Sequence, residues 1–65
     1  MNLAILLQII DAEEYITIIN CRGYKTLYKG IKYQVKNVKF DAEVIGLYTS
    51  DGEIVIEVCQ WKSFM

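Results

Sequence analysis

An Asp-Gly pair at residues 51–52 stands between two runs rich in β-branched and aromatic residues, a strong sequence signal for a two-residue β-hairpin. A loop of this length sets the register, so that Ser50 pairs with Glu53 and the pairing continues outward to Ile45 and Val58. One side of the hairpin is then expected to be buried: Ile45, Leu47, Ile54, Ile56 and Val58. The other is expected to face water for the most part: Gly46, Tyr48, Ser50, Glu53, Val55 and Glu57.

The first ten residues predict a short helix over 3–10, capped by the side chain of Asn2. Its apolar residues recur at helical spacing and predict a stripe that packs on a sheet: Leu3, Leu6, Leu7 and Ile10. Ile5 and Ile9 lie outside this stripe, four residues apart. They either flank a wide buried face or form a second apolar surface for a partner.

Three further segments are expected to be strands. Residues 15–19 are rich in β-branched residues, residues 24–29 follow a turn that contains Gly23, and residues 31–36 alternate between apolar and polar side chains. Together with the hairpin, these elements predict an α+β fold, a short N-terminal helix packed on a mainly antiparallel sheet of four or five strands. We expect one domain over residues 1–65, with 59–65 as a tail that could dock on it.

A chain of 65 residues buries only a small core and usually needs further support. Cys21 and Cys59 are too few for a disulfide framework and lack the spacing of a metal clip, so we expect two reduced thiols, with one bridge as the alternative. The opening apolar run has no positive n-region and is too short to span a bilayer. We therefore expect a cytoplasmic protein with no membrane segment and no metal.

The sequence offers little for catalysis. It contains no His, the commonest general base, and neither Ser50 nor Ser63 has a base near it in the sequence. Cys21 stands beside Arg22, which could lower the pKa of the thiol, but a small turn residue is the simpler interpretation. The four glycines are scattered, so no phosphate-binding loop is present. We expect a protein that is not an enzyme and has no cofactor.

The charge is strongly patterned. Residues 21–40 carry six basic side chains and no acid, whereas the segments on either side are acidic, and the net charge is −1. Three interpretations remain open: cross-strand charge pairing on solvated strands, contact with an acidic protein, or binding of nucleic acid by the basic segment 22–39. The candidates for contact with nucleic acid or with an acidic partner are Arg22, Lys25, Lys29, Lys32 and Lys36.

Several segments together carry a family resemblance: the leucine-rich opening, the Tyr-Ile-Thr-Ile-Ile strand, a turn with Gly, Leu-Tyr-Lys-Gly, and the closing run from Glu43 to Val58. Over residues 3–58 this pattern resembles short uncharacterised α+β proteins of phages and prophages of Gram-positive bacteria. The resemblance implies an accessory protein made in the host cytoplasm that binds a host protein, with components of host defence among the targets.

The leading hypothesis is therefore a non-enzymatic, phage-encoded interaction protein that binds and inhibits a host protein, such as a CRISPR nuclease. Its aromatic anchors are expected to be Tyr24, Tyr28, Tyr48 and Trp61. The alternatives are a small nucleic-acid-binding protein and, more weakly, a sponge for a small ligand. We also expect a homodimer, because a small chain that is 54% hydrophobic leaves large side chains to cover. The candidate dimer contacts are Ile5, Ile9, Tyr48, Val55 and Trp61.

Overall fold

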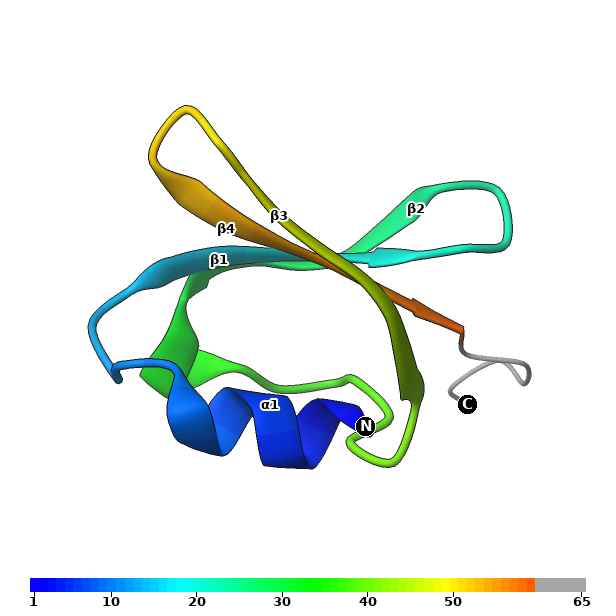
Figure 1. Cartoon of the computed structure of the whole chain (residues 1–65), viewed down its shortest axis with the longest axis horizontal. Coiled ribbons are helices and arrows are strands. Elements are labelled where there is room, and N and C mark those ends of the chain that lie inside the picture. The colour runs from blue at the N-terminus through cyan, green and yellow to red at the C-terminus, as the bar shows by residue number, and fades with distance from the viewer. Residues whose placement is uncertain (60–65) are drawn as a thin grey trace.

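A short helix and a four-stranded mixed sheet make up the fold in the computed structural model, which describes residues 1–59 (Figure 1). In chain order the elements are α1 (Leu3–Ile9), β1 (Tyr15–Asn20), β2 (Lys25–Ile31), the 3-10 helix η1 (Lys32–Gln34), β3 (Glu43–Ser50) and β4 (Glu53–Cys59). The expected α+β class is confirmed. The tail from residue 60 onward, with Trp61, lies outside the described residues.

The strands lie in the order β2-β1-β4-β3. Two antiparallel hairpins, β1–β2 and β3–β4, meet at the centre through a parallel pairing of β1 with β4. The parallel register places Ile16 beside Ile54 and Ile18 beside Ile56. This topology makes β2 and β3 the edge strands, and only the two central strands have a neighbour on both sides.

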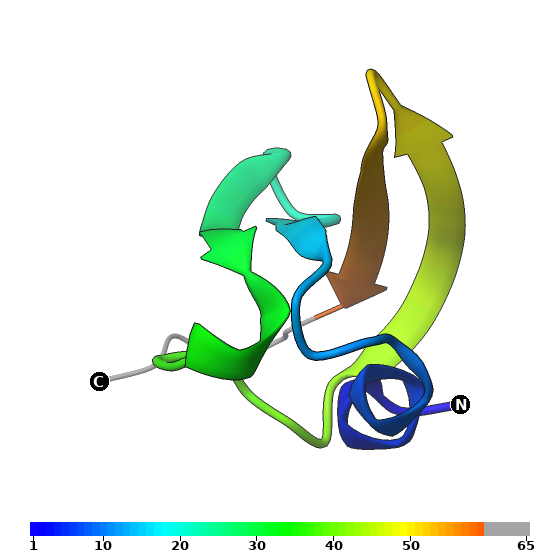
Figure 2. The same ribbon diagram turned by 90° about the vertical axis from the view of Figure 1, so that its left-hand side faces the viewer.

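Helix α1 packs beneath one face of the sheet, beside the segment that joins η1 to β3 (Figure 2). Its first turn is capped as expected, since the Asn2 Oδ1 accepts a hydrogen bond from the Ile5 N–H at 3.0 Å. The predicted apolar stripe is confirmed as well, because its first three members are buried and Ile10 packs against the core. The core joins residues of α1, the central strands and the segment before β3: Leu3, Leu6, Leu7, Ile16, Ile18, Val38, Ala42, Ile56 and Val58.

The predicted hairpin forms, with Asp51 and Gly52 both at positive φ and Ser50 paired with Glu53. The register also holds at Leu47 and Ile56. It fails at Ile45, because a β-bulge between Val44 and Gly46 inserts one residue and pairs Val44 with Val58 instead. The expected pairing of Ile45 with Val58 is therefore wrong.

The two sides of the hairpin are also less uniform than the alternation predicts. Ile56 and Val58 are buried as expected, but Leu47 remains 55% exposed and Ile45 is exposed too. Both belong to the edge strand β3, where α1 covers the sheet only partly. Val55, expected to face water, is only 7% exposed, because β4 is a central strand and side chains from both neighbours surround it. Whether a strand is central or at the edge of the sheet therefore decides the burial of its side chains more than their alternation does.

The strand expected at 31–36 is absent. β2 continues through Gly30 to Ile31, and residues 32–34 form the 3-10 helix η1. Backbone contacts to the α1–β1 loop account for the bend, because the N–H groups of Lys32 and Tyr33 donate to the carbonyls of Glu14 and Ala12 at 2.8 and 3.0 Å. The alternation of residues 31–36, with the two-residue period of a strand, therefore led to a wrong prediction for this segment.

Cys21 and Cys59 form a disulfide, so the expectation of two reduced thiols is wrong and the alternative holds. The parallel register explains the pairing. Asn20 lies beside Val58, and the two cysteines are the next residues along each strand, with a Cα–Cα distance of 5.3 Å. The bridge therefore closes the end of the sheet where β1 and β4 finish.

Candidate protein-binding surface

The charge blocks of the sequence lie on opposite halves of the sheet. The basic residues Lys25 and Lys29 lie on the edge strand β2. The hairpin of β3 and β4, on the far side, carries Glu43, Asp51, Glu53 and Glu57 and no basic residue from 43 to 59. The strand order β2-β1-β4-β3 therefore gives the sheet a basic half, with β2 at its edge, and an acidic half formed by the β3–β4 hairpin.

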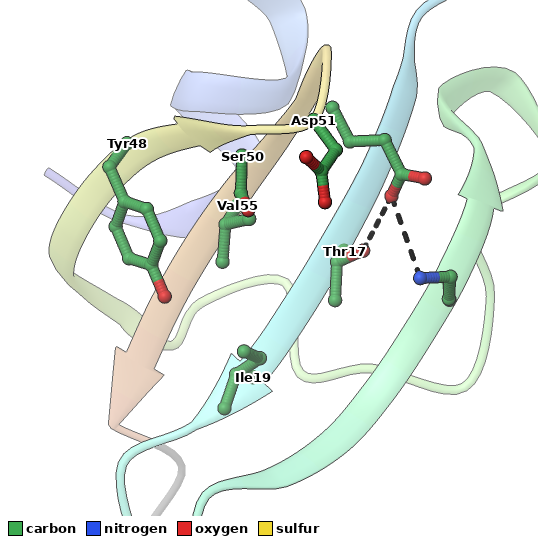
Figure 3. Close-up of a pocket in the computed structure, with 8 residues that line it drawn as sticks. Thr17, Ile19, Tyr48, Ser50, Asp51 and Val55 are labelled. Carbon is green, nitrogen blue, oxygen red and sulfur yellow. Dashed lines mark hydrogen bonds and ion pairs between the residues drawn. The ribbon is translucent and has the colours of Figure 1, made fainter.

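One ion pair spans the two charge blocks. The Lys29 ammonium lies 3.7 Å from the Glu53 Oε1, and the Thr17 hydroxyl donates to the same oxygen at 3.1 Å (Figure 3). This contact crosses β1 on the sheet face opposite α1. The Lys29 side chain is 66% exposed, so water screens the pair and it contributes little to stability. The Lys29 ammonium and the Thr17 hydroxyl both contact the Glu53 carboxylate on the open face of the sheet.

The ion pair forms one wall of a hollow of about 280 Å³ on this open face. Figure 3 shows Tyr48, Val55 and Thr17 pointing to the same side from three adjacent strands. The open-face hollow is lined by Thr17, Ile19, Lys29, Tyr48, Ser50, Asp51, Glu53 and Val55. Its mixture of hydroxyl, carboxylate and ammonium groups suits hydrogen bonding to a polar surface. Within residues 1–59 no three His, Cys, Asp or Glu side chains are grouped to hold a metal ion.

A second hollow, of about 590 Å³, lies between α1 and the β3–β4 hairpin and is apolar. We call it the apolar groove, lined by Leu6, Ile9, Ile10, Leu47, Tyr48, Thr49 and Ile54. Ile9 is 68% exposed at its rim, and Ile5 is exposed one turn earlier on the helix. Of the two interpretations of Ile5 and Ile9, their exposure favours a second apolar surface over the flank of a buried face.

The predicted aromatic anchors do not form one site. Tyr24 is 74% exposed, but it lies in the β1–β2 turn at the basic side of the sheet, whereas Tyr48 lies on β3 at the opposite side. Tyr28 is a poor anchor, because its ring packs against the core and its hydroxyl donates to the Ile31 carbonyl at 2.6 Å. Of the described candidates, only Tyr48 borders both hollows.

The five basic candidates are distributed along the β2 side of the molecule. Arg22 lies in the turn before β2, Lys25 and Lys29 in the strand, Lys32 in η1, and Lys36 in the following loop. Arg22, Lys25, Lys29 and Lys36 are exposed and Lys32 is half-buried. Lys29 forms an ion pair with Glu53, as the cross-strand interpretation of the charges anticipated.

The candidate dimer contacts differ in their exposure to solvent. Ile5, Ile9 and Tyr48 are exposed, so they are available to a partner. Val55 is buried among its strand neighbours and is wrong as a surface contact. Sequence analysis missed Leu47 and Ile45, which it assigned to the core. Both residues lie on β3, which pairs with β4 on one side and is the edge of the sheet on the other, and the hairpin pattern alone does not show which of its two strands is the edge.

No protein-family model, curated protein or solved structure matches this chain. Among the helices in residues 1–59, none is long and apolar enough to cross a membrane.

Proposed function

We propose that this chain is a non-enzymatic interaction protein that binds another protein through the apolar groove. The observation that carries the proposal is the exposure of Ile9 and Leu47 on opposite sides of that groove. Covering a large aliphatic side chain contributes about 1.5–3 kcal/mol, so a partner that covers both gains a substantial part of its binding energy there. Tyr48 at the rim adds an aromatic anchor of the kind that dominates protein interfaces.

The resemblance to short phage proteins directs the choice of partner. We propose a protein of the bacterial host, with defence nucleases such as CRISPR effectors as the first class to test, and inhibition as the consequence of binding. The cytoplasmic location belongs to the same proposal. The Cys21–Cys59 disulfide argues against the cytoplasmic location, because disulfides persist chiefly in oxidising compartments.

Affinity capture with matched variants tests the proposal. Leu47→Asp places a charge at the groove, and Tyr24→Asp places the same charge at an exposed site on the other side of the sheet. We expect the wild-type chain to capture a bacterial partner in a saturable manner. Leu47→Asp should lower the affinity for that partner at least about tenfold, or roughly 1.4 kcal/mol, whereas Tyr24→Asp should leave the affinity unchanged. A purified nuclease recovered in this way should also lose activity when the wild-type chain is added. Equal capture by both variants would refute the groove as the binding surface.

Nucleic-acid binding remains the second candidate, supported by the basic β2 edge with its exposed Lys25 and Lys29. Phosphate contacts release counterions, so affinity should fall steeply as salt rises. A gel shift at low and moderate salt tests it, and absence of a shift at low salt removes it. The small-ligand sponge stays the weakest proposal. The open-face hollow is its site, and a ligand screen read by melting temperature is its test.

A further inference from the structure

The outer edge of β3 is unusually open for a natural sheet. Exposed edges are commonly protected by lysines, as on β2, which carries Lys25 and Lys29. β3 has no basic residue, and from Val44 to Ser50 it carries no charge at all. The same segment is rich in residues that favour strands. The two edges of this sheet therefore differ, and only the β2 edge carries lysines that discourage pairing.

The hairpin geometry identifies which backbone groups point outward. Ser50 and Glu53 flank a two-residue turn. In such a turn the N–H of the residue that follows commonly donates a hydrogen bond to the carbonyl of the residue that precedes, so Ser50 and Glu53 form a hydrogen-bonded pair. Hydrogen-bonded and non-hydrogen-bonded pairs then alternate along the strands, which assigns Thr49 and Leu47 to non-hydrogen-bonded pairs. Their N–H and C=O groups point away from β4. These groups form a row that is able to pair with another strand.

One end of this edge already pairs with an extended segment. The Val44 N–H donates to the Met1 carbonyl at 2.9 Å, and Asn2 forms an isolated antiparallel bridge with Glu43. The remaining edge, residues 45–50, is about 20 Å long at roughly 3.4 Å per residue. In Figure 2 this part of β3 forms the outer margin of the sheet, and its beginning lies near α1. An added strand would therefore run beside the apolar groove.

We propose that the β3 edge binds an extended segment of a partner protein by strand addition. This inference rests on the proposed function and specifies how the partner docks. The segment carries apolar side chains at alternate positions, which enter the apolar groove beside Ile9 and Leu47. It carries basic residues at its ends, because Glu43 and Asp51 lie at the two ends of β3. Antiparallel pairing with a second copy centred on Leu47 would instead oppose Glu43 to Asp51 at both ends, which like-charge repulsion disfavours.

A synthetic peptide tests this occupant. Its core alternates valine and threonine, with two lysines at each end, and a control peptide has glutamates in place of the lysines. With the isotopically labelled full chain, we expect the lysine peptide to bind and to slow amide exchange at Leu47 and Thr49 at least about tenfold. We expect the glutamate peptide to bind at least about tenfold more weakly. Equal binding of the two peptides would overturn the charge argument, and no binding up to about 1 mM would overturn strand addition.

A matched pair of variants isolates the backbone contact. Thr49→Pro removes the outward N–H at an edge position that tolerates proline, and Thr49→Val keeps that N–H with a similar shape. We expect Thr49→Pro to weaken peptide binding at least about tenfold relative to Thr49→Val. The NMR spectra of both variants should show that they remain folded. The amide-exchange result in the wild-type chain decides the question if Thr49→Pro does not fold.

The outcomes separate this inference from the proposed function. If Leu47→Asp abolishes capture of the bacterial partner while Thr49→Pro binds as well as Thr49→Val, the groove is an interface without strand addition, and this inference falls alone. If sedimentation shows that the chain pairs with itself and protects Leu47 and Thr49 without any peptide, the occupant is a second copy and the basic segment is wrong.

Discussion

Reducing the Cys21–Cys59 bridge should destabilise the fold strongly. The bridge joins residues 38 apart, and restricting an unfolded chain over a loop of that length stabilises the native state by about 4 kcal/mol in the chain-entropy model. A domain of this size is stable by only about 3–10 kcal/mol in total. At about 4–8 °C per kcal/mol, we expect reduction to lower the melting temperature by about 15–30 °C.

Thermal melts followed by circular dichroism, with and without reductant, measure this shift. A double variant, Cys21→Ser with Cys59→Ser, is the control, and its melting temperature should match that of the reduced wild type and not respond to reductant. Mass spectrometry of the untreated chain should show the loss of two hydrogen atoms that accompanies the bridge. A bridged chain whose melting temperature changes by less than about 5 °C on reduction would refute the loop-entropy reasoning.

Three further predictions concern the glycines, the helix cap and self-association. Gly30→Ala should cost about 1–3 kcal/mol in unfolding free energy, because φ is +154° and a Cβ would lie 2.9 Å from the Tyr28 hydroxyl. Gly46→Ala should cost less, about 1 kcal/mol, because its φ is not positive, the nearest atom is the carboxylate oxygen at the end of the flexible Glu57 side chain, and the Glu57 Cβ at 3.3 Å needs only a small shift. Urea melts measure both. Asn2→Ala should lose about 1 kcal/mol through the missing bond to the Ile5 N–H, and an unchanged urea midpoint would contradict this. Light scattering at micromolar concentration should give a homodimer mass that Ile5→Asp, at an exposed position outside the apolar groove, reduces to that of a monomer, and a monomer mass for the wild type at every concentration would refute the predicted dimer.

Much of the local structure follows from the sequence because local chemistry decides it. The Asn2 cap, the leucine stripe of α1 and the Asp51–Gly52 turn each depend on a few neighbouring residues, and each forms as predicted. Such features need no knowledge of which strands meet. The same reasoning failed at residues 31–36, where contacts with the α1–β1 loop replace the strand that alternation favours.

The candidate site was harder to predict because it depends on strand order. Leu47 and Ile56 share one side of the hairpin, but Leu47 lies on an edge strand and Ile56 on a central one, so only Ile56 is buried. The disulfide has the same origin. Cys21 and Cys59 meet only through the parallel pairing of β1 with β4, which no local pattern in the sequence indicates. Knowledge of that single pairing would have corrected both predictions.

Photo-crosslinking from two positions tests the proposed binding surface most directly. A benzophenone side chain replaces Ile9 at the apolar groove in one protein and Tyr24 in the β1–β2 turn in the other, both at highly exposed sites. Each is mixed with the bacterial partner recovered by the wild-type chain and irradiated. If the groove is the interface, position 9 crosslinks to the partner in good yield and position 24 does not. Crosslinking from position 24 alone would contradict the account and place the interface at the basic side of the sheet.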